Sequence, residues 1–165
     1  MTDPANRIIR TATADDVPLV LEFVKTLAEY EKLSGHVTTT ETTLHESLFG
    51  PQPGTEMLLA YENHTPVGFA VFFHNFSTFL GVKGLWLEDI FVKPAFRGRG
   101  HGKALLLHVA RIAHERGCGR FEWSALDWNT PAWDFYKALG AVPLEDWTMF
   151  RLTGAALERL AKMPG

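Results

Sequence analysis

The feature that most constrains this chain is a glycine-rich segment over residues 97–102, with the sequence Arg-Gly-Arg-Gly-His-Gly. The apolar run before it, over 84–92, predicts a β-strand, and the amphipathic run after it, over 103–116, predicts a helix. Glycine lets the backbone approach an anion closely, and the N–H groups and dipole at a helix start favour negative charge. The pattern therefore predicts a site for a pyrophosphate or phosphate group, with a ligand-free glycine turn as the alternative.

Two common phosphate-binding motifs do not describe this segment. A P-loop ends in Gly-Lys followed by Ser or Thr, whereas Gly102 and Lys103 are followed by Ala104. A dinucleotide fingerprint requires G-x-G-x-x-G in an early strand–helix unit, whereas this segment has a glycine at every second position and lies past mid-chain. The sequence therefore argues against both motifs.

Length and composition predict one globular domain. The chain has 165 residues, so we expect a single domain over residues 1–165. Hydrophobic residues make up 46% and charged residues 21%, as in a typical globular protein. Because no apolar stretch is long enough for a bilayer and residues 1–4 do not resemble a signal peptide, we expect a cytoplasmic protein without a membrane partner. The net charge of −3 argues against a nucleic-acid partner and is compatible with a cationic substrate.

The cysteine and histidine content predicts no metal site. Cys118 is the only cysteine, which excludes an intramolecular disulfide and a CxxC motif. The seven histidines show neither H-x-x-x-H nor H-x-H spacing. We therefore expect no bound metal, and a packing role for Cys118.

Strand and helix patterns alternate along the chain without an internal repeat or a linker. Apolar runs between turn signals predict strands over 7–11, 57–61, 67–76, 84–92, 121–126 and 147–152. Helical spacing and capping residues predict helices over 17–33, 103–116 and 130–140, one from the cap Thr40 through Phe49, and one from Thr153 onward. Together they predict an α/β sheet whose first strands are antiparallel and whose later part is a β-loop-α-β unit.

Two segments resemble the signatures of one enzyme family. Arg97, Gly100 and Gly102 occupy the defined positions of the pattern [RQ]-x-x-G-x-[GA]. The run over 129–141 resembles the stretch N-x-x-A-x-x-F-Y-x-x-x-G. Both patterns are those of the GCN5-related N-acetyltransferase (GNAT) superfamily. The resemblance implies an α/β (α+β) GNAT fold, in which a mixed, twisted sheet of six to seven strands is flanked by helices.

The resemblance also implies acetyl-CoA as co-substrate, with its pyrophosphate on the glycine-rich loop. The implied cofactor-binding residues come from a strand, the loop and a later helix: Ile90, Phe91, Val92, Arg97, Gly98, Arg99, Gly100, His101, Gly102, Lys103, Asn129 and Ala132. Asn129 occupies a position that commonly hydrogen-bonds the cofactor. Tyr136 occupies the position that commonly protonates the departing thiolate.

Further segments resemble one branch of this superfamily, the spermidine/spermine (diamine) acetyltransferases. The runs Leu-Ala-Glu-Tyr-Glu over 27–31 and Leu-Glu-Asp-Ile-Phe-Val over 87–92 carry this likeness, which covers nearly the whole chain. The hairpin over 61–68 and the run over 141–147 are shorter than in the animal enzymes, which leaves the identity of the amine open. The likeness implies a homodimer, a small diamine or polyamine as substrate, and acceptor contacts from Tyr30, Glu31, Glu88 and Glu145.

Acetyl transfer requires a neutral amine, which points to a carboxylate in the acceptor site. Aliphatic ammonium groups have a pKa near ~10.4, so freeing the nitrogen at pH 7 costs roughly 5 kcal/mol. A carboxylate can hold the incoming cation and help to remove its proton through water. We interpret Glu88 as this residue, with a buried ion-pair partner of an arginine as its alternative role. Since neighbouring strand residues point to opposite faces, we expect Asp89 to be structural or at the pocket rim.

Tyr136 is interpreted as the acid that protonates the leaving CoA thiolate. A phenol with a pKa near ~10 can protonate a thiolate whose thiol has a pKa near ~8.5, although a core tyrosine on an amphipathic helix is the alternative. We expect the oxyanion to meet a backbone N–H over 90–92, and amine attack to be direct in a ternary complex.

Other functions stay open: acetylation of an amino-acid side-chain amine such as thialysine or lysine, or of a protein amine. Outside catalysis, a CoA-binding regulatory domain also stays open.

Overall fold

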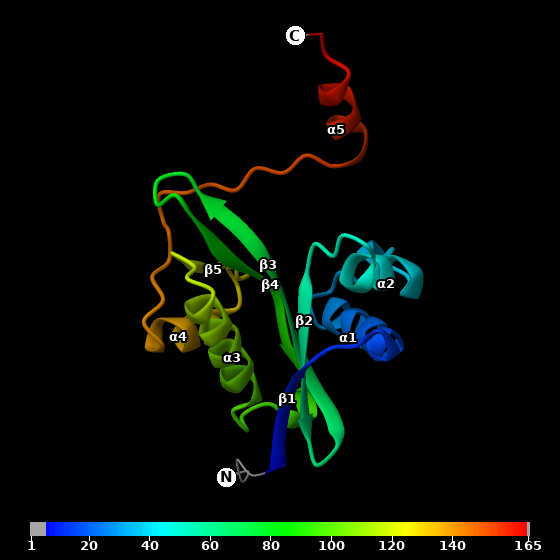
Figure 1. Ribbon diagram of the computed structural model, residues 1–165, viewed down its shortest axis with the longest axis vertical. Helices are drawn as coiled ribbons and strands as arrows, with labels where there is room; N and C mark the ends of the chain where they lie inside the picture. Colours follow the sequence, from blue (N-terminus) through cyan, green and yellow to red (C-terminus); the bar gives the residue numbers. More distant parts are fainter. Residues whose placement is uncertain (1–5, 165) are drawn as a thin grey trace. The chain divides into compact units, whose positions relative to one another are not determined.

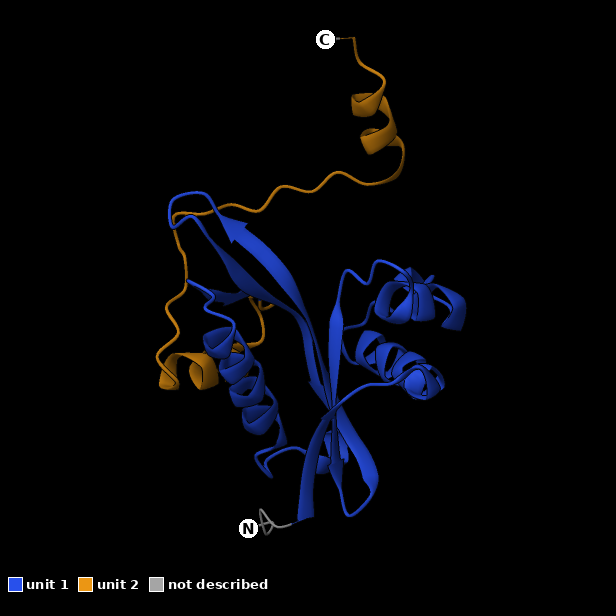
Figure 2. Cartoon of the chain, in the orientation of Figure 1, with its two compact units in different colours: residues 1–124 blue, residues 125–165 orange. Residues whose placement is uncertain are grey.

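The computed structural model describes residues 6–164 (Figure 1). The chain forms two compact units, residues 1–124 and residues 125–165, which are coloured separately in Figure 2. Unit 1 contains the sheet and the glycine-rich loop, and unit 2 contains the segment around Tyr136. The expectation of a single domain over 1–165 stays a prediction.

Unit 1 is built on one mixed sheet of five strands in the order β1-β2-β3-β4-β5. The strands are β1 (Arg7–Thr11), β2 (Glu56–Glu62), β3 (Thr65–Ser77), β4 (Val82–Val92) and β5 (Phe121–Trp123). The first four strands pair antiparallel, and β5 pairs parallel to β4. The α/β class, with antiparallel strands first and a β-loop-α-β unit later, is therefore confirmed.

Helices cover both faces of this sheet. Figure 1 shows α1 (Val17–Tyr30) and α2 (Glu41–Phe49) on one face and α3 (His101–Glu115) on the other. Three short 3₁₀ turns lie within residues 7–124: η2 (Ala14–Asp16), η3 (Ser34–His36) and η4 (Pro94–Phe96). No helix within residues 6–164 is both long and apolar enough to cross a membrane.

The core beneath α1 is aromatic. The ring of Phe23 lies 5.4 Å from that of Phe69 on β3 and 6.5 Å from that of Phe91 on β4, and all three side chains are buried. Burial of each ring contributes about 1.5–3 kcal/mol to folding. On the opposite face, α3 buries Leu105 and Val109 against the sheet. This packing holds the end of β4 and the start of α3 in place.

Local signals explain most of the boundaries in unit 1. The predicted cap Thr40 is confirmed, because its hydroxyl accepts a hydrogen bond from the N–H of Thr43 at 3.2 Å. The turn between β2 and β3 has positive φ at Asn63 (48°) and His64 (66°), the geometry of a two-residue type I′ hairpin. The helix predicted over 17–33 ends at Tyr30, because the chain turns at Lys32 with φ 61°.

Unit 2 contains two helices, α4 (Thr130–Ala138) and α5 (Gly154–Ala161), the second beginning after Thr153 as predicted. The predicted strand over 147–152 is wrong, and so is the expected count of six to seven strands. Residues 125–164 contain no strand, so the run over 147–152 pairs with no neighbouring segment of unit 2 that could take up its N–H and C=O groups. The strand predicted over 121–126 shortens to β5 and ends before unit 2 begins.

Candidate functional site

The glycine-rich loop joins β4 to α3 through η4 and presents backbone donors at the helix start. Gly98 (φ 75°) and Gly100 (φ 82°) adopt the left-handed conformation that favours glycine, and Gly100 is the N-cap of α3. Apart from bonds within α3 itself, the backbone N–H groups of Gly98, Gly100 and Gly102 donate to no backbone carbonyl within residues 6–164. Together with the dipole of a 15-residue helix, these donors suit an anion.

The charged side chains of the loop turn toward the protein itself. The guanidinium of Arg99 donates to Glu62 Oε1 at 2.7 Å and to the carbonyl of Ala95 at 3.1 Å. The imidazole of His101, which is 1% exposed, lies with Nε2 2.7 Å from Glu62 Oε2. Lys103 is exposed. The loop therefore offers an anion mainly backbone N–H groups.

Arg97, at the start of the loop, links it to the end of α1. Its guanidinium lies 4.0 Å from the centre of the Tyr30 ring and 5.6 Å from that of Phe91. Its Nε donates to the carbonyl oxygen of Val92 at 3.0 Å. The structure therefore brings Tyr30, a predicted acceptor residue, beside Arg97, a predicted cofactor residue.

A β-bulge interrupts β4 at Glu88, the predicted site carboxylate, and at its neighbour Asp89. Asp89 lies opposite Val71 of β3 and Leu87 lies opposite Phe72, so Glu88 is an extra residue without a partner on β3. The strict alternation that placed Glu88 and Asp89 on opposite faces therefore does not hold here. An extra residue of this kind re-aims its neighbours, and the bulge lies where β4 supplies the predicted site.

Glu31, Glu88 and Asp89 form an acidic cluster in unit 1. Burial, together with the negative charges of Glu88 and Glu31, raises the pKa of Asp89 to about 6. Burial also raises the pKa of Glu31, which follows α1. Glu88 is exposed, and its Oε2 accepts a hydrogen bond from the indole N–H of Trp86 at 2.9 Å. Of the three, Asp89 has the environment of a general base that works near neutral pH.

The remaining predicted residues lie in unit 2. Asn129 is the N-cap of α4, and its carbonyl oxygen accepts from the N–H groups of Ala132 at 3.0 Å and Trp133 at 3.2 Å. Tyr136, in the last turn of α4, is half-buried, and burial raises the pKa of its phenol. Glu145 lies exposed in the irregular segment after α4. The raised pKa keeps Tyr136 protonated at neutral pH, as an acid must be.

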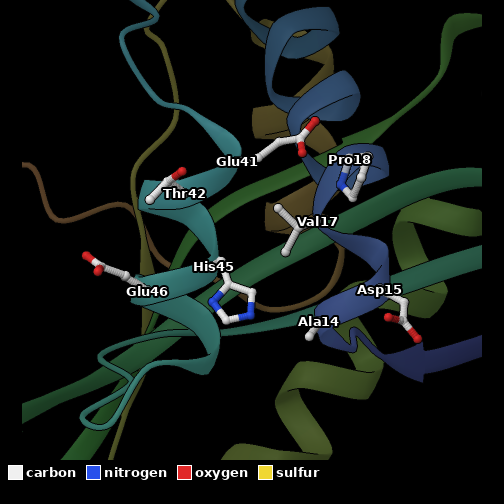
Figure 3. Close-up of a pocket in the computed structure, with 8 residues that line it drawn as sticks. All are labelled: Ala14, Asp15, Val17, Pro18, Glu41, Thr42, His45 and Glu46. Carbon is white, nitrogen blue, oxygen red and sulfur yellow. The ribbon is translucent and has the colours of Figure 1, made fainter.

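Figure 3 shows a separate surface hollow of about 610 Å³ between the starts of α1 and α2. Its lining includes Asp15, Glu41, His45 and Glu46, and residues 6–164 contain no cluster of potential metal ligands. The hollow begins at the first turn of α1, whereas the acidic cluster lies beyond its last, about 20 Å along a 14-residue helix. The hollow is therefore not part of the candidate site.

Sequence and structural relatives agree with this geometry. The family model described as Acetyltransferase (GNAT) family matches residues 22–141. Thialysine N-epsilon-acetyltransferase of Bos taurus is 39% identical, over 93% of this chain and 96% of the relative. Spermidine/spermine N(1)-acetyltransferase-like protein 1 of Homo sapiens is 31% identical, over 93% of this chain but 23% of its own length.

Among solved structures, an integron cassette protein from the mobile metagenome of V.cholerae superposes with a TM-score of 0.79. Its sequence is 28% identical, and the aligned region covers 96% of this chain and 99% of the cassette protein. The family match spans β4, the glycine-rich loop and α4, and it includes every predicted site residue except Glu145. The chain therefore belongs to the acetyltransferase (GNAT) family, whose members in general use acetyl-CoA as the acetyl donor.

Proposed function

We propose that this acetyltransferase moves the acetyl group of acetyl-CoA to a primary amine of a small molecule that carries two cationic nitrogens. The observation that carries this proposal is the acidic cluster of Glu31, Glu88 and Asp89, with the raised pKa of Asp89. Three carboxylates within reach of one another favour a cation, and a pKa of about 6 leaves Asp89 ionised but still basic at pH 7.5. The reaction belongs in the cytoplasm, where acetyl-CoA is available.

In the proposed reaction the substrate ammonium first gives its proton to Asp89, directly or through water. The free amine attacks the thioester carbon in a ternary complex, so a C–N bond forms and the C–S bond breaks. A backbone N–H over 90–92 stabilises the oxyanion, and Tyr136 protonates the departing thiolate. The proton that the attacking nitrogen loses as the amide forms returns through water to the Tyr136 phenolate. Glu31 and Glu88, with Tyr30 and Glu145, hold the cationic substrate.

The second candidate acceptor is the side-chain amine of a dibasic amino acid. Its support is the 39% identity to a thialysine N-epsilon-acetyltransferase. Such a substrate adds an α-carboxylate, which three neighbouring carboxylates repel unless a cation faces it. Arg97, stacked on the predicted acceptor residue Tyr30, is such a cation.

Matched amines separate the two candidates. Ornithine and putrescine, or lysine and cadaverine, present the same reacting amine and differ by the α-carboxylate. We expect the purified protein to release the free thiol of CoA from acetyl-CoA when these amines are present. The ratio of kcat/KM for the diamine to kcat/KM for the matching amino acid then identifies the acceptor class. Butylamine is the control, because it carries one ammonium group and no second cation, and it should be at least about tenfold poorer if the lost charge contact is worth about 1.4 kcal/mol. Thiol release with none of the amines, at any acetyl-CoA concentration, would contradict the proposal.

Gly102 gives a clean test of the acetyl-CoA site. A side chain at Gly102 is free of a positive-φ constraint, and its Cβ would meet Val92 Cγ2 at 3.8 Å, an ordinary contact. Gly102→Val should therefore fold, yet raise the acetyl-CoA Kd by about tenfold or more because the side chain blocks backbone approach to pyrophosphate. Calorimetry measures this, with Ala110→Val on the same helix as the control. An unchanged Kd in a folded Gly102→Val protein would remove the loop from the acetyl-CoA site.

A homodimer is part of the proposal. Val142, Trp147 and Phe150 are 79%, 76% and 90% exposed in unit 2, an apolar surface of the kind that a second copy covers. Light scattering at micromolar concentration should give the mass of two chains, whereas the mass of one chain would refute this part of the proposal.

A further inference from the structure

Glu62 is a buried charge that the proposed reaction does not use. It is the last residue of β2 and is 8% exposed. Its two carboxylate oxygens accept from Arg99 Nη1 and from His101 Nε2, each at 2.7 Å. These contacts lower the pKa of Glu62, so the carboxylate is ionised at neutral pH. Both partners belong to the glycine-rich loop or the first turn of α3, so this buried charge is directed at the loop.

Arg7, at the start of β1, holds the same loop from the other side. Its Nε donates to His101 Nδ1 at 3.2 Å, and its Nη2 donates to the carbonyl oxygen of Arg99 at 2.7 Å. Because His101 accepts at Nδ1, its proton lies on Nε2, which donates to Glu62. The imidazole is thereby fixed in one tautomer and one orientation between two strands.

The bond from Arg7 to the Arg99 carbonyl has a geometric consequence. In a planar trans peptide the C=O and the following N–H point in opposite directions. With its carbonyl held by Arg7, the Arg99–Gly100 peptide therefore directs the N–H of Gly100 away from Arg7. Apart from bonds within α3 itself, that N–H, like those of the neighbouring glycines, donates to no backbone carbonyl within residues 6–164.

We propose that Arg7, Glu62 and His101 are positioning residues that hold the glycine-rich loop ready for the pyrophosphate of the acetyl donor. The inference rests on the proposed use of acetyl-CoA and adds the residues that decide which donors are accepted. A loop ordered in advance loses little freedom when the anion binds, so affinity for the pyrophosphate is gained. A thioester without a pyrophosphate gains nothing from this order, so the three residues select for the nucleotide end of the donor.

The test compares two donors and two arginines on one strand. Arg7→Met keeps the aliphatic stem and removes both donated bonds. Arg10→Met is the matched control, since Arg10 bonds to Asp16 and Tyr61 and has no contact with the loop. For each protein, kcat/KM is measured with acetyl-CoA and with S-acetylpantetheine, which lacks the pyrophosphate, and calorimetry gives the Kd for CoA.

We expect Arg7→Met to lower kcat/KM for acetyl-CoA by about fivefold to fiftyfold, to raise the Kd for CoA equally, and to leave S-acetylpantetheine unchanged. Arg10→Met should leave the ratio of the two donors as in the wild type. Glu62→Gln, which keeps shape and removes the charge, should change the donor ratio in the same direction as Arg7→Met. Equal losses for both donors, or no loss for either, would overturn the inference. A wild-type protein that does not bind CoA would overturn the proposed function itself.

Discussion

Replacing Tyr136 with phenylalanine is expected to lower kcat by roughly 10²–10⁴-fold, the range for loss of a positioned general acid. The change removes one hydroxyl and little volume, so packing in α4 is retained. Because burial raises the pKa of Tyr136, the phenol is protonated throughout the neutral range and can donate its proton to the thiolate. Affinity for acetyl-CoA should change by less than about twofold, since the hydroxyl acts on a charge that develops only during the reaction.

Tyr61→Phe is the matched control, because it removes the same hydroxyl from β2, where the oxygen accepts from Arg10 at 2.7 Å. Its kcat should equal that of the wild type. Rapid-mixing measurements must establish that acetyl transfer, and not product release, limits turnover. If Tyr136→Phe keeps most of its activity under that condition, a bound water is the better candidate for the acid.

Asp89→Asn is expected to lower activity and raise stability together. If Asp89 accepts the substrate proton, kcat/KM falls by roughly 10²–10⁴-fold. The wild-type profile of kcat/KM should fall as the pH drops through about 6, because only the ionised carboxylate accepts a proton. The asparagine variant should lack this limb. Its remaining pH dependence then reports the substrate amine.

The stability gain follows from the raised pKa of Asp89. The carboxyl titrates at about 6 in the folded protein and at about 3.9 in the unfolded chain, so between these values the folded state binds more protons. Stability therefore falls as the pH rises from about 4 to 6, by at most about 3 kcal/mol and by about 1–2 kcal/mol after allowing for partial exposure. Asparagine avoids this loss. The free energies of unfolding should thus agree at pH 4, while at pH 8 Asp89→Asn should be more stable.

Glu88→Gln distinguishes the role of Glu88 from that of Asp89, the neighbouring carboxylate at the bulge. Glu88 is exposed and bonded to Trp86, so its amide variant should fold, and loss of the Glu88 charge should lower the raised pKa of Asp89 toward its ordinary value. It should slow turnover less than Asp89→Asn. If Glu88→Gln is the more damaging variant, Glu88 is the base, as the sequence alone had indicated. Denaturant unfolding of Asp89→Asn that shows no gain at pH 8 would refute the raised pKa.

The sequence predicted the parts of the site that depend on neighbouring residues in the chain. Glycines before an amphipathic run mark a helix start, and the structure places α3 there with Gly100 as its N-cap. Thr40 and Thr153 were predicted as helix starts for the same local reason, and both precede helices. The roles of the predicted cofactor and acceptor residues stay predictions.

Features that depend on pairing between distant segments could not be predicted. The bulge at Glu88 exists only in the register between β3 and β4, and no residue type in 87–92 signals it. Glu62 follows an apolar strand and precedes a turn, so the sequence gives no reason to expect that it is buried against His101, 39 positions away. The unformed strand over 147–152 is the converse case, in which the apolar pattern is present but a pairing strand is not.

The bulge also sets the polar residues of β4 apart from the hydrophobic residues of the core. The extra residue changes which side chains of β4 lie on each face of the sheet. Trp86 pairs with Phe73 and Asp89 pairs with Val71, so Trp86 and Asp89 share a face although they are three positions apart. Leu87 stays buried against the opposite face, as it would in a regular strand. If the polar residues at the bulge hold the amine as proposed, they can be replaced without disturbing the hydrophobic residues on either side. One extra residue in β4 would thus leave the substrate open to change while the fold is kept.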